Sequence, residues 1–341
     1  MISLEKIAEL AGVSRRTVTR ALKDKALVKP QTLAKIEAVL QENNYTPNLA
    51  ARYLAIKKNH YRILFMFMRA KSSLFHAYLY EEAQKKAAEL ESFGLKVDFL
   101  ILDRDLHEES LNFEEIVSNF NYDFLIALPV YEAYFKPYFD RLVNVAAQKG
   151  VPFMFYNMDD RQYQRLCYVG CDYVKAGRIG AGLVALAVQE QGRVAIISSR
   201  TSSLISYMER IQGFKQEIAE RYPQLSIVYE HALEHEVLDV DLDQLRSLKV
   251  NAVYLVNPGD YSVVPHLQDN LPDLNLKIIT NDRLPPSEIL LKEGKIAALI
   301  EQEPAKQVNL PLDIALDYLV NRKVPQDVYY TELSVLVRQC I

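Results

Sequence analysis

The chain has 341 residues, half of them hydrophobic and a quarter charged, as in a globular protein of more than one domain. No apolar run reaches the ~18 residues that span a bilayer and no secretory signal begins the chain, so we expect a cytoplasmic protein without a membrane partner. The net charge of −4 is unevenly divided, with +6 on residues 1–58 and −10 on the remainder. A basic end on an acidic body favours docking of that end on an anionic polymer.

Two short amphipathic helices are expected at the N-terminus, the first over residues 2–11. Gly12 provides the turn between them because a positive φ costs glycine least. Ser14 caps the second helix, where its hydroxyl accepts a free main-chain amide. A third helix begins at Lys29–Thr32, with proline in its first turn. The apolar positions expected to form the shared core are Leu4, Ile7, Ala8, Ala11, Val18, Ala21, Leu22, Leu33, Ile36, Val39 and Leu40.

The second helix is strongly basic. Arg15, Arg16 and Arg20 are long enough to reach guanine edges or phosphates when such a helix lies in a major groove. A helical hairpin with a solvated basic face is the alternative interpretation. The turn, the cap, the third helix and the positive charge occur together, however, and they predict double-stranded DNA as a partner.

A boundary is expected after the three helices. Asn48 can cap a helix of roughly two turns over Asn48–Ala55, which is too short to persist in isolation. A polar linker, Ile56–His60, follows it. The predicted domains are therefore a helix–turn–helix domain at 1–46, a hinge helix and linker at 47–60, and a body at 61–341.

The body alternates between strand and helix patterns, which predicts an α/β fold. Its strands are short and apolar on both faces, as in parallel sheets covered by helices. They are too many for one small domain, so we expect two lobes. The expected strands are Arg62–Met68, Lys96–Leu102, Asp123–Leu128, Val151–Asn157, Arg193–Ser198, Ser226–Glu230, Asn251–Val256 and Leu276–Thr280, with helices that include Ala77–Leu90, Tyr173–Val188 and Met208–Glu220.

The head carries two longer patterns. They are Ile7-Ala8-x-x-Ala11-Gly12-Val13-Ser14-x-x-Thr17-Val18-Thr19-Arg20 and Asn44-Tyr45-x-Pro47-Asn48-x-x-Ala51-Arg52-x-Leu54. With these residues, the segment 1–56 resembles the head of the LacI/GalR family of bacterial transcription regulators. The family usually has serine where this chain has Thr19.

The resemblance implies how the head binds DNA. Arg15 and Arg16 would be the main base-reading pair, and hinge helices from two subunits would enter the minor groove. Leu54 would wedge into the central base step, which kinks the duplex; packing of Leu54 against the body is the alternative. The partners implied are a pseudo-palindromic operator and a second subunit, in a homodimer or tetramer. The implied DNA-binding residues are Ser14, Arg15, Arg16, Thr17, Thr19, Arg20, Asn48, Ala51 and Leu54.

The body also resembles the family, more loosely. The residues that carry this are Cys167–Gly177, Glu209–Phe214, Lys277–Asp282 and Glu301–Pro304. The resemblance implies the two-lobed fold of periplasmic sugar-binding proteins, with an effector bound between the lobes. We expect lobe 1 at about 61–158 plus 296–322, and lobe 2 at about 159–283 plus 324–341.

A ligand set follows from the resemblance, position by position. Arg210 would donate to vicinal oxygens and Asp282 would accept from hydroxyls, a pairing that suits a polyol ring. Ligands of open α/β sheets bind at the carboxyl ends of strands; a surface cap or a salt bridge is the alternative role of each residue. The effector-binding residues implied are Lys71, Phe75, Asn157, Arg210, Asn257, Asp282 and Gln302.

The loop Arg69–His76 departs from the family pattern, and the chain has no tryptophan to stack on a sugar. These departures leave the effector open between a sugar or sugar derivative, a sugar phosphate, and a purine or nucleoside co-repressor. A cationic pocket for a sugar phosphate would use Lys71, His76, Arg200 and Arg210, although Lys71 and Arg200 also suit solvated loops.

Enzyme signatures are weak, since the chain has no P-loop and neither G-x-G-x-x-G nor G-x-S-x-G. We interpret Asp159–Asp160 and His107–Glu109 as solvated loop charge. Cys167, Cys171 and Cys340 lack zinc-site spacing and are expected to be reduced, packed thiols. The prediction is therefore a protein that is not an enzyme and uses no metal or cofactor. The resemblance to the LacI/GalR family implies that it is a repressor of carbohydrate-utilisation genes.

Overall fold

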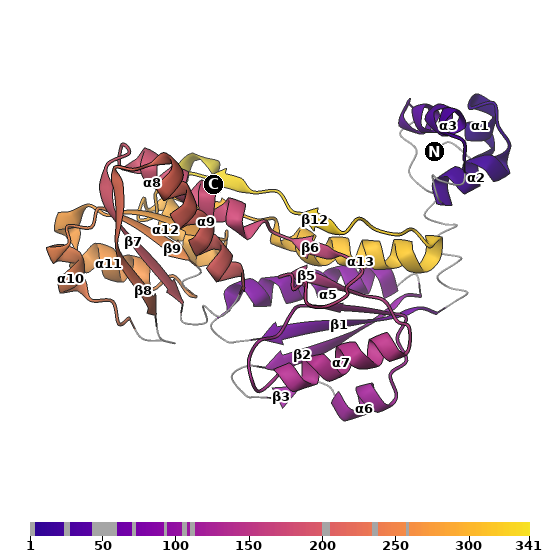
Figure 1. Ribbon diagram of the computed structural model, residues 1–341, viewed down its shortest axis with the longest axis horizontal. Helices are drawn as coiled ribbons and strands as arrows, with labels where there is room; N and C mark the ends of the chain where they lie inside the picture. The colour runs from indigo at the N-terminus through magenta and orange to yellow at the C-terminus, as the bar shows by residue number, and fades with distance from the viewer. Residues whose placement is uncertain are drawn as a thin grey trace.

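The computed structural model describes residues 4–23, 28–42, 60–69, 73–91, 94–103, 108–109, 113–199, 205–233, 238–256 and 259–341. These residues form a helical head followed by an α/β body with two sheets (Figure 1). This is the fold class predicted from the sequence.

The head consists of α1 (Leu4–Leu10), α2 (Arg15–Lys23) and α3 (Pro30–Glu42). Gly12 has the predicted positive φ, at 65°. The Ser14 hydroxyl accepts from the Thr17 amide at 3.1 Å, so Ser14 caps α2 as expected. The buried core of the head is small and matches the predicted apolar positions: Ile7, Ala8, Ala11, Val18, Ala21 and Ile36.

The first sheet of the body has the strand order β12-β6-β5-β4-β1-β2-β3, and only β3 pairs antiparallel among its described strands. Buried apolar strands occupy its centre, as in a sheet whose two faces are covered by helices. The strands are β1 (Arg62–Arg69), β2 (Lys96–Asp103), β3 (Glu108–Glu109), β4 (Phe124–Ala127), β5 (Phe153–Asn157), β6 (Tyr168–Gly170) and β12 (Val328–Tyr330).

The second sheet has the order β13-β11-β10-β9-β7-β8, with only the edge strand β13 antiparallel in the described part. Figure 1 shows the two sheets in separate lobes. The strands are β7 (Gly192–Ser199), β8 (Leu225–Leu233), β9 (Ala252–Val256), β10 (Lys277–Asn281), β11 (Ala298–Glu301) and β13 (Ser334–Leu336).

Helices cover both sheets. Around the first sheet they are α5 (Leu74–Glu91), α6 (Phe113–Ser118), α7 (Lys136–Gln148) and α13 (Pro304–Asn321). Around the second they are α8 (Tyr173–Ala187), α9 (Ile205–Arg221), α10 (Leu242–Ser247), α11 (Val263–Asn270) and α12 (Pro285–Lys292), with short 3-10 turns at Pro272–Leu274 and Arg338–Cys340. None of the described helices is long and apolar enough to cross a membrane.

The chain passes between the lobes three times, after β6, after β11 and after β12. The crossings are tied to one another by hydrogen bonds that main-chain amides donate. The Thr331 amide donates to the Gly170 carbonyl at 2.8 Å, and the Glu332 amide donates to Glu303 Oε2 at 2.7 Å. Because of these hydrogen bonds, a movement of one crossing displaces the others.

The predicted lobe boundaries require correction. β6 lies in the first sheet, although residues from 159 onward were assigned to lobe 2. β11, which was expected in lobe 1, lies in the second sheet, and β12, which was expected in lobe 2, lies in the first sheet. The reason is that β6 and β12 pair with each other in parallel, Val328 with Tyr168, and extend the first sheet towards the crossings.

Helices α8 and α9 pack at backbone distance because each contributes a glycine. A Cβ on Gly177 would lie 2.0 Å from the Arg210 carbonyl oxygen, and one on Gly213 would lie 2.1 Å from the Val174 carbonyl oxygen. Both distances are far below van der Waals contact. The glycines therefore fix the position of α9, and with it the main chain of Arg210.

Candidate functional sites

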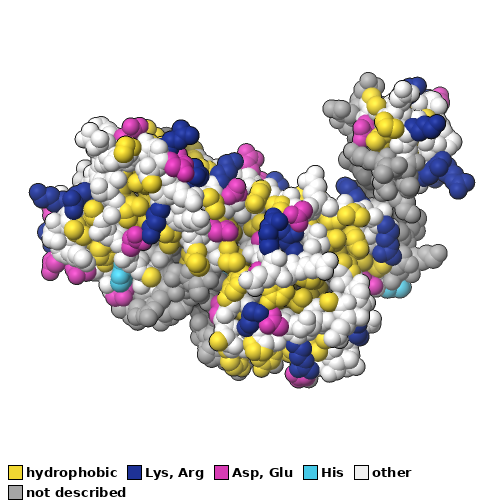
Figure 2. All heavy atoms as spheres, in the orientation of Figure 1, with side chains coloured by type: hydrophobic (Ala, Val, Ile, Leu, Met, Phe, Trp, Pro, Cys, Tyr) yellow, Lys and Arg dark blue, Asp and Glu magenta, His cyan; other side chains and the backbone are white. Residues whose placement is uncertain are grey.

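The exposed face of α2 carries the predicted DNA-reading residues. Arg15, Arg16, Thr19 and Arg20 line one surface hollow, and Lys and Arg side chains project from the head (Figure 2). All four are solvent-exposed. The structure thus places the four predicted residues side by side on one helix, as a major-groove contact requires.

The hydroxyls in this region act mainly within the helix. The Ser14 and Thr17 hydroxyl oxygens lie 2.8 Å apart, and Thr19 Oγ1 donates to the Arg15 carbonyl at 2.9 Å. Their observed role is to cap and orient α2. The arginines are left as the long, flexible groups of this face.

Arg15 has a partner in the head itself. Its Nε lies 3.0 Å from Glu5 Oε1 on α1, with 65% and 61% of the two side chains exposed. An ion pair this exposed contributes ~1 kcal/mol or less. Arg15 can therefore exchange Glu5 for a phosphate or a base edge at small cost.

Several predicted residues lie outside the described residues. These are Asn48, Ala51 and Leu54 of the predicted hinge, and Lys71 and Asn257 of the predicted effector set, together with Arg200. Their roles stay predictions.

The second candidate site, the predicted effector site, lies at the carboxyl ends of β5, β10 and β11. Arg210 in α9 and Asp282 after β10 are both buried, with Arg210 Nη2 3.7 Å from Asp282 Oδ1. The guanidinium also lies over the Tyr173 ring, 4.7 Å from its centroid. Arg210 and Asp282 thus form a buried ion pair on the second lobe, against the first crossing.

Gln302 completes the Asp282 environment from the second crossing. Its Nε2 donates to Asp282 Oδ1 at 2.5 Å. Asp282 adopts a positive φ of 67°, which turns its side chain back towards this group, and Tyr261 holds the turn by donating to the Asp282 carbonyl at 3.0 Å. Such backbone conformations persist where the surroundings impose them and are concentrated at functional sites.

Asn157 joins the same network from the first lobe. It ends β5 with a positive φ of 61°, and its Nδ2 donates to the Tyr173 hydroxyl at 3.0 Å and to Gln307 Oε1 at 2.9 Å. Gln307, in the second turn of α13, was not predicted as a site residue. Its Nε2 donates to the Gln302 carbonyl at 3.0 Å and to Gln302 Oε1 at 3.1 Å.

Four of the predicted effector residues, Asn157, Arg210, Asp282 and Gln302, are therefore brought together in one buried network. Phe75 is buried near the start of α5, with its ring 6.0 Å from that of His76. Phe75 packs in the hydrophobic core of the body rather than in that polar network.

Burial governs the electrostatics of the pair. It raises the pKa of Asp282, although Arg210 and the Gln302 hydrogen bond both lower it. Burial alone lowers the pKa of Arg210, but the ionisable groups around it, Asp282 first, outweigh that effect and raise it overall. The arginine stays charged, and the carboxylate bears the desolvation penalty.

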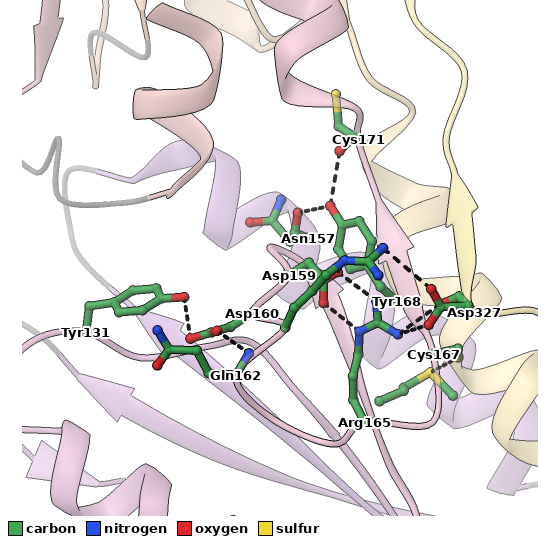
Figure 3. Close-up of polar contacts among 12 residues, drawn as sticks. Tyr131, Asn157, Asp159, Asp160, Gln162, Arg165, Cys167, Tyr168, Cys171 and Asp327 are labelled. Atoms are coloured by element: carbon green, nitrogen blue, oxygen red, sulfur yellow. Dashed lines mark hydrogen bonds and ion pairs between the residues drawn. The ribbon is translucent and has the colours of Figure 1, made fainter. Parts of the chain in front are cut away.

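The loop between β5 and β6 carries a clamp that sequence reasoning missed (Figure 3). Arg165 donates to both carboxylate oxygens of Asp159, at 2.5 and 2.7 Å, and to the Asp327 side chain at 2.6 Å. Only 4% of the Arg165 side chain is exposed. Arg165 thus fixes the residue before β12, and with it the approach to the third crossing.

The interpretation of Asp159–Asp160 as solvated loop charge is wrong. Asp159 is paired with Arg165, and Asp160 is buried (Figure 3). Asp160 accepts from the Tyr131 hydroxyl at 3.0 Å and from the Gln162 amide at 2.9 Å. Both carboxylates organise the loop. His107 lies outside the described residues.

The cysteines fit the prediction in part. Cys167 and Cys171 are buried free thiols, whereas Cys340 is exposed rather than packed. Burial raises the pKa of Cys167 and of Cys171 to about 12. Because the thiolate is the reactive form, neither buried thiol reacts readily at neutral pH.

We expect a thiol reagent at pH 8 to label one cysteine of the native chain and all three after denaturation. Cys340→Ser should abolish labelling of the native chain, and the denatured variant should then label at its two remaining cysteines. Mass spectrometry of the labelled peptides identifies the site. Rapid native labelling of Cys171 would contradict the burial of the first crossing.

Comparison with known proteins places both parts of the chain. Residues 66–323 match the family model described as a periplasmic binding protein domain, and residues 3–48 match that of bacterial regulatory proteins, lacI family. The first of these models covers more than half of the chain.

Among curated proteins, the chain is 43% identical over 60 residues to the probable HTH-type transcriptional repressor ExuR of Bacillus subtilis, a match covering 18% of each chain. The match thus spans less than a fifth of that relative.

The body resembles many solved structures, among them two binding proteins. One is a periplasmic solute binding protein of Actinobacillus succinogenes with bound D-allose, 21% identical, with a TM-score of 0.66 and coverage of 82% of this chain and 98% of the other. The second is AraP, an arabinose binding protein of Geobacillus stearothermophilus, 17% identical, with a TM-score of 0.66 and coverage of 82% and 97%. At these identities the likeness shows the fold. Taken with the head and the two sheets, the matches show that the chain belongs to the lacI family of bacterial regulatory proteins, with a periplasmic binding protein domain behind its helix–turn–helix head.

Proposed function

We propose that the chain is a sequence-specific DNA-binding transcriptional repressor of carbohydrate-utilisation genes. A sugar or sugar derivative bound between the lobes controls its affinity for a pseudo-palindromic operator, to which it binds as a homodimer or tetramer. The curated relative in the comparison is described as a repressor, and one neighbouring structure holds D-allose. The first description supports a repressor, and the second supports a sugar as the ligand of the body.

The observation that carries the proposal is the buried network of Arg210, Asp282, Gln302 and Asn157. It joins groups at the ends of strands from both lobes, on a chain whose head presents a basic helix. Removing a charged arginine and aspartate from water is expensive, and such pairs are not needed for stability. A buried pair of charges beside the lobe crossings therefore favours a ligand-binding role.

The network also suggests how binding is transmitted. A sugar hydroxyl that donates to Asp282 takes the place of the Gln302 amide, which then donates to a sugar oxygen. Gln302 lies in the second crossing, beside Glu303, which accepts from the third crossing through the Glu332 amide. A change at Asp282 thus reaches two of the three connections that set the lobe angle, and through the lobes the spacing of the paired hinges.

A sugar phosphate is the second candidate effector, because Arg210 provides one fixed cation in the site. A purine or nucleoside co-repressor is the third. The observed network has one carboxylate acceptor and several amide and guanidinium donors, which suits a compound with many oxygens.

A thermal-shift screen of sugars, sugar phosphates and nucleosides separates these candidates. A ligand that binds only the folded chain raises its stability, by about 2.7 kcal/mol at a hundredfold excess over Kd. We expect a sugar or sugar derivative to give the largest shift in Tm. A shift given by nucleosides alone would replace the sugar with a purine-type effector, and no shift from any class would contradict the effector site.

Arg16→Ala is expected to weaken DNA binding by ~1–3 kcal/mol at particular bases of a selected operator. Arg16 is exposed on the α2 face and is long enough for a bidentate contact with guanine. Binding to a library of single-base operator variants measures this effect. Arg246→Ala, which removes one exposed charge from the body, is the control. Uniform weakening across the library would make Arg16 a phosphate contact instead.

A further inference from the structure

In the described part of the chain, Gln307 is a fully buried side chain that connects the first lobe to Gln302 by hydrogen bonds on both sides. It lies in α13, which packs on the first sheet, whereas Asp282 and Arg210 belong to the second lobe. The hydrogen bonds run in sequence from Asn157 through Gln307 and Gln302 to Asp282. We call this series the amide relay.

The direction of the amide relay follows from groups that can only accept. The ionised Asp282 carboxylate can only accept hydrogen bonds, so Gln302 turns its NH₂ towards Asp282 and its carbonyl oxygen towards Gln307. Gln307 must then present its own NH₂ to Gln302. The Gln302 main-chain carbonyl, also acceptor-only, imposes the same orientation independently.

Because the Gln307 NH₂ group faces Gln302, the Gln307 Oε1 atom must face Asn157, where it can only accept. Its Oε1 receives a hydrogen bond from Asn157 Nδ2, which an aspartate at 157 could not supply when ionised. This accounts for asparagine at position 157. The Tyr173 hydroxyl donates to the Asn157 carbonyl at 2.7 Å and closes this end of the relay.

We propose that Gln307 is a positioning residue for the effector site: through the amide relay it holds Gln302 as a hydrogen-bond donor to Asp282 or to the sugar oxygen that replaces it. The proposal rests on the proposed function, because it assigns Gln302 to the sugar. It adds a residue that selects for ligands offering an acceptor oxygen at this point. A ligand with only donors there would face the Gln302 NH₂ without a partner.

Gln307→Glu tests the direction of the relay. An ionised glutamate still accepts a hydrogen bond from Asn157. It cannot donate to the main-chain carbonyl oxygen or to Oε1 of Gln302, and its charge repels both oxygens. The Gln302 side-chain amide therefore turns over and places its carbonyl oxygen against the Asp282 carboxylate. A protonated glutamate donates as Gln307 does. The variant is therefore defective at pH 8 and restored at pH 5.5. Gln307→Met, which has similar length and does not titrate, is defective at both values.

The first measurement needs no ligand. The Tm of the full chain should fall for Gln307→Glu relative to wild type by about 2–4 °C or more as the pH rises from 5.5 to 8. The sign follows because the buried glutamate has a raised pKa, so its folded state binds the proton more tightly and loses stability as pH rises. Asp282, Arg210 and Tyr173 face the relay in every variant. The pH dependence of Tm in Gln307→Met therefore measures the contribution of these groups, which is subtracted from that of Gln307→Glu. A Gln307→Glu chain that is folded at pH 5.5 and unfolded at pH 8 supports the relay.

The second measurement is titration with D-allose, D-arabinose and the strongest sugar of the thermal-shift screen. Gln307→Glu should bind about tenfold or more weakly than wild type at pH 8 and within a few fold of wild type at pH 5.5. Equal loss at both pH values, or wild-type behaviour at pH 8 in both Tm and titration, would overturn the proposal. If no sugar binds wild type, the proposed function fails, while the Tm series still decides whether the relay has the stated direction.

Discussion

Arg210→Met is expected to destabilise the folded chain by about 3–5 kcal/mol, because it leaves the Asp282 carboxylate buried without its cation. Methionine fills much of the arginine volume, so the loss reflects charge rather than a cavity. Urea-induced unfolding at fixed pH measures it. The double variant Arg210→Met, Asp282→Asn should recover most of the lost stability, since no unpaired charge then remains.

The pH dependence of Arg210→Met has a defined sign. Burial already raises the pKa of Asp282, and removal of Arg210 raises it further. The folded variant then binds a proton more tightly than the unfolded chain, so its stability relative to wild type falls as pH rises above about 4. A destabilisation that does not change with pH, or that persists in the double variant, would contradict the buried ion pair.

Gly177→Ala is expected to destabilise the chain by about 1–3 kcal/mol or more through overpacking. The new Cβ would lie 2.0 Å from the Arg210 carbonyl oxygen, and since that atom is main chain, α9 must move as a whole. The same shift displaces Arg210, so binding of the strongest sugar from the thermal-shift screen should weaken as well. Unfolding curves and titration with that sugar measure the two effects.

Gly182→Ala is the matched control, because it lies in the same helix and its new Cβ would meet only the Tyr222 hydroxyl at 3.6 Å. That distance is ordinary contact, and alanine is favoured over glycine in a helix by about 1 kcal/mol. Gly182→Ala should therefore be neutral or stabilising. Equal destabilisation by both substitutions would mean that helix α8 responds to any change and that the close contact with Arg210 is not special.

The long elements could be predicted from the sequence because their signals are local. The run Arg62–Met68 is apolar on both faces and forms the inner strand β1 of the first sheet. Ser14 and Gly12 also act as their residue types predict. β6, β11, β12 and β13 were not predicted, since three or four residues carry little periodicity and their strand character comes from pairing with distant partners.

The effector site could be predicted in part, because some of its residues also give a local signal in the sequence. Asn157, Asp282 and Gln302 follow strands, and strand ends of a parallel sheet converge. Gln307 gives no local signal: it is one polar residue on a helix whose partner Asn157 lies 150 positions away. The Arg165 clamp depends likewise on Asp327, 162 positions distant, and so the pairing of Asp159 with Arg165 could not be read from the loop alone.

The central claim is that the site between the lobes governs the reading of DNA. Its most direct test is the Kd of the full chain for an operator selected from random duplexes, measured with and without the strongest sugar of the thermal-shift screen. We predict that the sugar changes the wild-type Kd by about 5–150-fold, and that Arg210→Met, Asp282→Asn binds the operator as wild type does but no longer responds. A wild-type Kd unaffected by a bound sugar, or a double variant that responds as wild type does, would contradict the account.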